Sequence, residues 1–364
     1  MTIWKYAELF SQTPAQHRVS LGEGSTPVVR SRRVGPAVGL EHLYFKLEQC
    51  NPTGSYKDRY AAAAISDMVA GDKSRCIATT SGNTGSALAA YCTAAGIACR
   101  IAVVDTAPPD KLKQMMSYGA DIFMVRGFGH EPSVTSAVFD FLRGESAKPG
   151  SQLQISAFKF SPAGMAGVQT IAYELAEQAV VGEIDGGVID HVFVQAGGGG
   201  LTLAQTQGFA QLVERGELAK SPAVHCVQPE GNDTIAGPLR DGEDAAHDVT
   251  CTATISGLQV ANVIDGDEVV HTCRASGGTG HVLSDDFIYE VQKRLALEEG
   301  LFSEPAGAVG VAGALQAAKN GEIAPDARVV CLITGIGFKD APAVDRMVAG
   351  RECPLLDVED LNAG

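Results

Sequence analysis

The sequence of 364 residues lacks several features that mark whole classes of protein. Its nine cysteines are an odd number without CxxC or CxxH spacing, and its eight histidines form no HxH or HExxH motif. Neither a disulfide framework nor a metal centre is therefore expected. The sequence has no run of about 18 apolar residues, which a membrane-spanning helix requires. Positive charge is also scarce: the net charge of −15 argues against nucleic acid, which needs a basic surface on its partner.

The start of the chain lacks the apolar core of a secretory signal peptide, because Lys5 and Glu8 stand where that core would lie. Together with the absence of a disulfide pattern, this favours a cytoplasmic protein. Aromatic residues are few, at 6%, whereas hydrophobic residues reach 45% and glycines number 42. A core of small side chains is typical of helices that pack closely on parallel sheets.

Short β-rich segments alternate with Ala-rich helical segments from Leu43 onward. Strands are expected at residues 43–47, 75–79, 100–104, 121–125, 192–195, 224–227 and 329–334. Helices are expected at residues 57–69, 84–95, 109–118, 133–142, 166–178, 201–212, 286–295 and 306–319. This alternation predicts an α/β protein with parallel-rich sheets flanked by helices.

The first of four motifs is Asn51-Pro-Thr-Gly-Ser-Tyr-Lys-Asp-Arg59. Its Pro and Gly favour a turn, and Ser55 is expected to cap a helix that opens at Tyr56. Lys57 then stands in the first helical turn, where the helix dipole disfavours a protonated amine. A neutral amine suits Schiff-base formation, although a surface lysine would show the same local pattern.

The second motif is Thr79-Thr-Ser-Gly-Asn-Thr-Gly-Ser86, which links a predicted strand to a predicted helix. The small residues Ser81, Gly82 and Thr84 leave backbone N–H groups free to face a carboxylate or a phosphate. Asn83 offers an amide to a ring hydroxyl or a carbonyl oxygen. The alternative is a simple strand-to-helix turn capped by Ser81 or Thr84.

The third motif consists of Gly197, Gly198, Gly199 and Gly200, which follow an apolar strand and precede a helix. Glycines at a helix N-terminus make a cradle of unhindered amides that suits a phosphate. The motif lacks the GxGxxG dinucleotide fingerprint and the lysine of the Walker loop. We interpret it as a phosphate cradle of another kind, because four structural glycines would carry a large entropic cost.

The fourth motif places Thr334 at the end of the apolar run Val329–Ile333, just before a glycine turn. A hydroxyl at the end of a buried strand can meet a pyridine nitrogen without fully protonating it, as a carboxylate would. An ordinary strand end is the alternative. The four motifs are more specific in this order than any of them is alone.

In this order the motifs resemble the fold-type II, tryptophan-synthase-like family of pyridoxal 5′-phosphate (PLP) enzymes. The similarity runs from Leu21-Gly-Glu-Gly-Ser-Thr-Pro27 to Gly337-Phe-Lys-Asp340, and within that family it is greatest to threonine synthases. The implied fold has two α/β domains with twisted, parallel-rich sheets. Residues 1–60 and 155–350 are expected to form the large domain, residues 61–154 the small domain and residues 351–364 an acidic tail.

The resemblance implies a role for each motif. Lys57 would carry PLP as a Schiff base and act as the catalytic base, Asn83 would meet the 3′-oxygen, and Gly197–Gly200 would bind the phosphate. Thr334 would face the pyridine nitrogen, and Ser81–Thr84 would hold the carboxylate of a small amino-acid substrate. A homodimer without nucleic-acid or membrane partners is expected.

Three departures from the threonine synthases concern the substrate pocket. Those enzymes hold the phosphate of O-phosphohomoserine with an arginine just before a helix that resembles residues 167–174. Residues 161–166 offer no cation here, and Lys159 is the nearest residue that could take the arginine's place as a substrate ligand. The glycine loop continues with Leu201, as in serine/threonine ammonia-lyases, and Ile336 stands where a histidine is common.

Three enzymatic functions therefore stay open. The first is the threonine-synthase-like conversion of O-phosphohomoserine to threonine. The second is ammonia-lyase elimination from serine or threonine, and the third is replacement at Cβ of an activated serine. A protein that only binds an anion would need the glycine loop alone, without a lysine beside it or a hydroxyl at the last strand.

Overall fold

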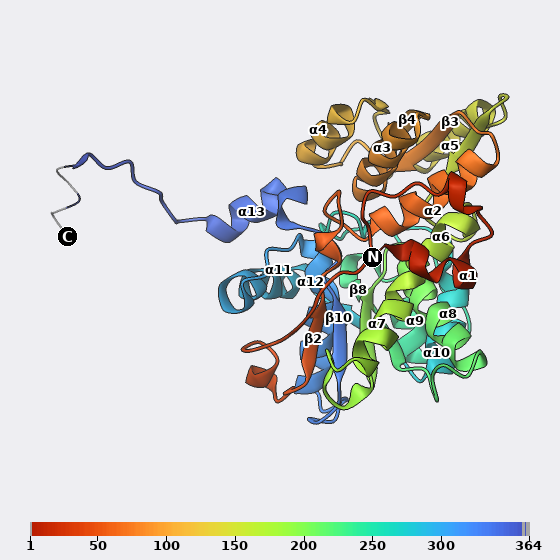
Figure 1. The fold of residues 1–364 in the computed structure, drawn as a ribbon. Helices are drawn as coiled ribbons and strands as arrows, with labels where there is room; N and C mark the ends of the chain where they lie inside the picture. Colours follow the sequence, from red (N-terminus) through yellow and green to blue (C-terminus); the bar gives the residue numbers. More distant parts are fainter. Residues whose placement is uncertain (1, 359–360, 362–364) are drawn as a thin grey trace.

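Two sheets form the framework of the chain, of which the computed structural model describes residues 2–358 and 361 (Figure 1). Their strands are β1 (Val28–Arg30), β2 (Leu43–Lys46), β3 (Arg75–Thr80), β4 (Ala98–Val103), β5 (Asp121–Met124), β6 (Ser151–Gln154), β7 (His191–Gln195), β8 (Ala223–Pro229), β9 (Gly280–Leu283) and β10 (Val329–Leu332). The larger sheet has the order β1-β2-β10-β7-β8-β9, and the smaller has the order β5-β4-β3-β6. Among the described strands, every pair of neighbours is parallel except β1 and β2.

Helices cover both sheets. They are α1 (Ala7–Phe10), α2 (Lys57–Ala70), α3 (Asn83–Ala95), α4 (Pro109–Ser117), α5 (Pro132–Ser146), α6 (Pro162–Val168), α7 (Thr170–Val180), α8 (Gly200–Glu214), α9 (Ala236–Asp241), α10 (Gly266–Ser276), α11 (Asp285–Arg294), α12 (Pro305–Lys319) and α13 (Ala341–Val348). Short 3₁₀ turns occupy Ile3–Tyr6, Ala15–His17, Pro36–Val38, Glu48–Cys50, Asp185–Gly187, Glu230–Asn232 and Gly337–Lys339, and Leu295–Glu299 is a π-helical turn. Helix α2 packs against both α3 and α6, so it joins the smaller sheet to the rest of the molecule (Figure 1).

The α/β fold class predicted from the sequence is confirmed, and all seven strands and eight helical segments expected there are present with shifted ends. The segment expected as one helix at 166–178 is divided into α6 and α7 at Gln169. Strands β1, β6 and β9 were not predicted from the sequence; β6 is largely polar (Ser-Gln-Leu-Gln) and so lacks the apolar run that marks a buried strand. Helices α1, α9, α10 and α13 are also additions. The division into two domains stays a prediction.

Small residues let helix α12 lie very close to the larger sheet. A Cβ atom at Gly310 would lie 2.8 Å from the carbonyl oxygen of Phe193, and one at Gly313 would lie 2.8 Å from the Val227 side chain. Both distances are below ordinary contact, so only glycine permits this approach. The glycine-rich composition therefore reflects close packing of helix on sheet.

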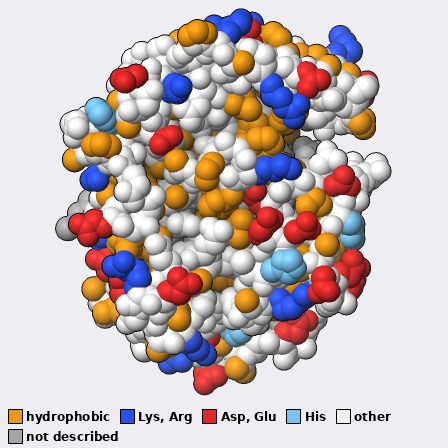
Figure 2. All heavy atoms as spheres, turned by 90° about the vertical axis from the view of Figure 1, so that its right-hand side faces the viewer, with side chains coloured by type: hydrophobic (Ala, Val, Ile, Leu, Met, Phe, Trp, Pro, Cys, Tyr) orange, Lys and Arg blue, Asp and Glu red, His pale blue; other side chains and the backbone are white. Residues whose placement is uncertain are grey.

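The face of the molecule shown in Figure 2 is mixed in charge, with hydrophobic side chains gathered near its middle. On the face shown in Figure 2, Lys and Arg side chains are interspersed with Asp and Glu rather than gathered in one area. No helix among the described residues has the length and apolar character needed to cross a membrane. Residues 351–358 of the predicted acidic tail are exposed and lead away from α13 (Figure 1); residues 359–360 and 362–364 of that tail lie outside the described residues.

Candidate active site

Lys57 is the first residue of helix α2, which agrees with the expected range 57–69 and is one position later than the opening at Tyr56 predicted from the first motif. The predicted cap at Ser55 is wrong: its hydroxyl is buried without a hydrogen-bond partner among the described residues, and its backbone pairs with Gly335. Asp58 closes the turn instead, because its carboxylate accepts hydrogen bonds from the backbone N–H and the hydroxyl of Thr53, both at 3.0 Å. A carboxylate in the first turn also suits the helix dipole.

A buried ion network fixes this end of α2. The Arg59 guanidinium forks onto two carboxylates, Glu48 at 2.7 Å through both oxygens and Glu174 at 2.8 Å through both oxygens. Lys46 donates to Glu174 at 2.8 Å, and Thr26 donates to Glu48 at 2.6 Å. Segments that the sequence analysis groups by resemblance, 21–27, 51–59 and 167–174, therefore meet in one structural network behind the site.

The Lys57 amine lies beside Ser156, to whose hydroxyl it donates a hydrogen bond at 2.8 Å. The same hydroxyl is 2.9 Å from the hydroxyl of Thr84. Burial lowers the pKa of Lys57 to about 7, while the charge of Asp265 opposes this change. The expectation of a weakly basic lysine is confirmed in direction, but desolvation is the main cause rather than the helix dipole.

The glycine loop lies close to Ser156 and Asp265. A Cβ atom at Gly200 would lie 3.3 Å from the carbonyl oxygen of Ser156 and 3.2 Å from Oδ2 of Asp265. Gly199 has a φ of 94°, which a residue with a side chain rarely adopts. Within the described part of the chain, no group accepts a hydrogen bond from the N–H groups of residues 197–202, whereas the next one, of Leu203, donates to Gly199. Six free amides at the start of α8 make a site for an anion.

Thr334 lies at the end of β10, where its hydroxyl oxygen accepts a hydrogen bond from the Gln195 side-chain amide at 2.7 Å. Because the oxygen already accepts, the hydroxyl hydrogen is available for an acceptor such as a pyridine nitrogen. The carbonyl of Thr334 accepts from the N–H of Tyr56 at 3.0 Å. The fourth motif is thus joined directly to the residue before Lys57.

The loop Ser81–Thr84 also has unused donors. No described group accepts from the N–H groups of Ser81, Asn83 and Thr84, whereas Gly82 and Gly85 donate to the hydroxyl of Thr80 at 2.8 and 3.0 Å. Free amides at the N-terminus of α3 suit a carboxylate. The predicted carboxylate loop therefore has the donors that its proposed role requires.

Three charged residues of the site, Asp265, Glu304 and Lys111, are absent from the sequence-based prediction. Glu304 accepts a hydrogen bond from the Asn83 amide at 2.6 Å and lies 3.2 Å from the Lys111 ammonium. Both Glu304 and Lys111 are buried, and Lys111 also donates to Ser256 at 3.2 Å. Glu304 directly precedes Pro305, the first residue of α12. A carboxylate at the start of a helix that begins with proline is the sequence feature that could have marked Glu304 as a site residue.

Lys159 is exposed, and its backbone N–H donates to Asp265 at 3.2 Å. No hydrogen bond or ion pair joins its ammonium to another described residue of the site, and its role as a substrate ligand stays a prediction. Residues 162–168 form α6, which packs closely on α2: a Cβ atom at Gly164 would lie 2.6 Å from the Tyr60 ring. Residues 161–166, which contain no cation, therefore lie mostly in a helix that packs on α2.

With this geometry established, comparison with known proteins decides the family. The chain matches the model described as "Pyridoxal-phosphate dependent enzyme" over residues 19–335. The chain belongs to this family of PLP-dependent enzymes. The match spans all four motifs, and it agrees with the resemblance seen in the sequence.

Individual relatives support the same assignment. Threonine synthase of Methanocaldococcus jannaschii is 30% identical over 348 residues, which cover 94% of this chain and 82% of that protein. Threonine synthase of Synechocystis sp. is also 30% identical, over 337 residues that cover 92% of this chain and 81% of that protein. These two proteins confirm that the threonine synthases are relatives of this PLP-dependent enzyme.

Solved structures show the same fold at lower identity. Diaminopropionate ammonia lyase from Escherichia coli has a TM-score of 0.74 at 18% identity and covers 95% of this chain and 91% of its own. Threonine deaminase isoform 2 from Solanum lycopersicum has a TM-score of 0.72 at 19% identity and covers 96% of this chain and 94% of its own. The chain therefore has the fold-type II architecture predicted from its sequence.

The residues present fit PLP. The free amides of residues 197–202 suit a phosphate, the Thr334 hydroxyl can donate to a ring nitrogen, and the Lys57 amine contacts Ser156, which also contacts Thr84. Asp265 is the one negative charge beside the glycine loop that we find in the described residues, and both its oxygens already accept backbone N–H groups, of Phe158 and Lys159. Those bonds disperse its charge.

Proposed function

We propose that this PLP-dependent enzyme is a carbon–oxygen lyase that holds its cofactor on Lys57 and eliminates a leaving group from a small L-amino acid. One observation carries the proposal. The Lys57 amine and the Thr84 hydroxyl share Ser156 as hydrogen-bond partner, at 2.8 and 2.9 Å, between two sets of free backbone amides. One set suits the cofactor phosphate and the other suits the substrate carboxylate.

Bound PLP supplies an electron-withdrawing ring that stabilises negative charge at the substrate Cα. A free Lys57 amine, with a pKa of about 7, is substantially neutral at neutral pH and can take the proton from Cα. Ser156 orients this amine, and the free amides of Ser81–Thr84 hold the carboxylate so that the Cα–H bond stays within its reach. Thr334 offers the ring nitrogen a neutral partner, which favours elimination over transamination.

The leaving group that the site suits best is uncharged, such as the hydroxyl of serine or threonine. Residues 161–166 supply no cation, Lys159 is exposed, and the buried ammonium of Lys111 is already paired with Glu304. A phosphate normally needs an arginine fork or a free lysine. Asp265 lies beside both Lys57 and the glycine loop; the six free amides of the loop offset its remaining charge for the cofactor phosphate, but a second phosphate away from that loop would still be repelled.

Conversion of O-phosphohomoserine to threonine is the second candidate, because threonine synthases are 30% identical over more than nine-tenths of this chain. In that case Lys159 would have to turn inward as a point charge. Replacement at Cβ of an activated serine would use the same residues as the elimination and differs only in the nucleophile that follows.

Two measurements test the proposal. Borohydride reduction followed by peptide mapping should place a pyridoxyl label on Lys57, and a label on Lys159 or another lysine would refute the cofactor assignment. The value of kcat/KM is then compared for serine, threonine, O-acetylserine and O-phosphohomoserine. We expect serine or threonine to exceed O-phosphohomoserine on the order of tenfold or more.

Asp265→Asn and Lys159→Ala separate the two candidates. If Asp265 repels a phosphate, Asp265→Asn should improve kcat/KM for O-phosphohomoserine while changing little for serine. If the wild type makes threonine efficiently and Lys159→Ala abolishes it by raising KM, the uncharged leaving group is wrong and the second candidate holds.

A further inference from the structure

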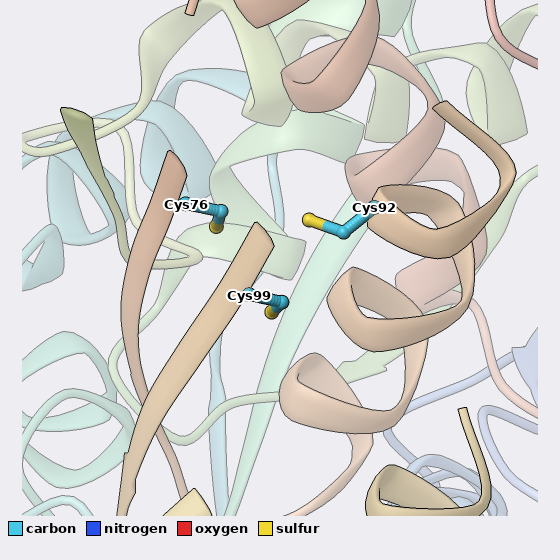
Figure 3. Close-up of side chains that lie close together, drawn as sticks. All are labelled: Cys76, Cys92 and Cys99. Carbon is cyan, nitrogen blue, oxygen red and sulfur yellow. The ribbon is translucent and has the colours of Figure 1, made fainter. Parts of the chain in front are cut away.

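Three cysteines that are far from CxxC spacing converge in the smaller sheet. Cys76 lies in β3, Cys99 in β4 and Cys92 in α3, and their sulfur atoms all lie within 4.8 Å of one another. Figure 3 shows the two strand cysteines side by side, with Cys92 facing them from the helix. Cys76 and Cys92 are fully buried, whereas Cys99 is partly exposed.

Charge argues against a metal ion at this cluster. No histidine, aspartate, glutamate or fourth cysteine of the described residues joins the three sulfur atoms, so a closed tetrahedral zinc site is not formed. Three thiolates around a divalent ion would also leave a net negative charge inside the apolar core to which Cys76 and Cys92 belong. A disulfide is neutral and carries no such cost.

The fold also selects the pair that can be bridged. Cys76 and Cys99 are direct partners in neighbouring parallel strands. Such strands lie about 4.7–4.9 Å apart with parallel side chains, whereas disulfides need Cβ atoms about 3.5–4.5 Å apart. A bridge between them would pull the sheet together. Cys92 belongs to the covering helix, so its side chain can approach Cys99 without changing the strand spacing.

We propose that Cys99 is a site of reversible oxidation by a peroxide and that Cys92 captures the oxidised sulfur as a Cys92–Cys99 disulfide. Access comes from the partial exposure of Cys99. The sulfur atoms of Cys76 and Cys92, which lie within 4.8 Å, interact with the Cys99 sulfur and lower the pKa of its thiol to about 5, which favours the reactive thiolate.

The reaction balances in two steps. The Cys99 thiolate attacks one peroxide oxygen, the O–O bond breaks, and the departing oxide takes a proton, so that the sulfur is oxidised to a sulfenic acid. The Cys92 sulfur then attacks the Cys99 sulfur. The S–S bond forms, the S–O bond breaks, and water leaves with the Cys92 proton. Overall, the two sulfurs give two electrons to the peroxide.

The experiment treats the purified full chain with hydrogen peroxide, denatures it and alkylates the remaining thiols. Cleavage after Tyr91 and Arg100 releases residues 92–100, which separates Cys92 and Cys99 from Cys76. We expect this fragment to be unalkylated and lighter by two hydrogen atoms, and to regain two alkylatable thiols after treatment with dithiothreitol. The Cys76 fragment should stay alkylated.

Two single variants and a second pair of buried cysteines, which serves as the control, complete the test. Cys76→Ala should still form the disulfide, whereas Cys92→Ala should leave a sulfenic acid on Cys99 that a 1,3-diketone traps. Cys226 and Cys273 are neighbours of each other and both are buried, so they should stay alkylatable at the same dose. An unchanged 92–100 fragment at a dose that oxidises the exposed Cys353 would overturn the proposal, as would a bridge from Cys76 to Cys99.

Discussion

Arg59 is the residue whose replacement tests the structural account most sharply. Its guanidinium is fully buried, and each of its two carboxylate partners is held through both oxygens. Glu174 keeps Lys46 as a partner at 2.8 Å if Arg59 is lost, whereas Arg59 is the sole ion-pair partner of Glu48 among the described residues. Arg59→Met should therefore leave Glu48 as a buried, uncompensated charge.

The expected cost follows from that stranded charge. Breaking a buried ion pair by removing one partner costs about 3–5 kcal/mol, which is a large part of a total stability of about 5–15 kcal/mol. The free energy of unfolding is measured by urea denaturation with linear extrapolation. Because α2 begins at Lys57, two residues before Arg59, we also expect weaker retention of PLP on dialysis.

Two further variants make the test decisive. Arg59→Met with Glu48→Gln should recover part of the loss, since the amide removes the unpaired charge and keeps the shape. Arg59→Lys serves where Arg59→Met is too unstable to purify, because a single ammonium cannot fork onto both carboxylates and should cost about 1.5–3 kcal/mol. A loss below about 1 kcal/mol for Arg59→Met, or no recovery in the double variant, would refute the reasoning.

Other substitutions probe the remaining charged groups. Lys111→Met should destabilise by up to about 3–5 kcal/mol, because it removes the ammonium 3.2 Å from the buried Glu304 carboxylate. The Asn83 amide and the charge of Lys339 remain to compensate that carboxylate, and adding Glu304→Gln should restore part of the urea midpoint. Burial lowers the pKa of His225, so its contribution to stability is complete above about pH 6.5 and is lost as the pH falls below that value. His225→Asn should flatten the acid slope of the unfolding free energy by up to about 1.4 kcal/mol per pH unit, and parallel slopes would contradict this. Asp265→Asn should lower the pKa of the released Lys57 amine further, seen as a shift of the acid limb of the kcat profile to lower pH, because kcat reports the enzyme–substrate complex in which that amine is free; an unmoved limb would exclude their coupling.

The four motifs were predictable from the sequence because each depends on local chemistry. A glycine run leaves its own amides free, and a strand that ends at Thr334 exposes a hydroxyl whatever surrounds it. Their alternation with apolar strands also predicted the α/β architecture correctly. The predicted helix cap at Ser55 was wrong, because the side chain of Asp58 accepts the hydrogen bonds of this turn and the Ser55 hydroxyl accepts none from any described residue.

The partners within the site were not predictable in this way. Ser156 is 99 positions from Lys57, and Glu304 is 221 positions from Asn83, so no local pattern marks either contact. Arg59 stands in the same motif as Lys57. In the structure its side chain pairs with the buried carboxylates of Glu48 and Glu174, whereas the Lys57 amine lies in the site. Only the packing of α2 between the sheets separates these roles.

The sequence by itself determined the family, the cofactor and the order of elements, because those depend on hydrophobic periodicity and on short motifs whose chemistry is local. Tertiary structure alone decided which charged and sulfur-bearing side chains meet. Cys76, Cys92 and Cys99 lack any metal-ligand spacing, yet parallel pairing of β3 with β4 and the packing of α3 bring their sulfur atoms together. Parallel strands need a crossover between them, so residues that become neighbours are separated by a whole helix in the chain.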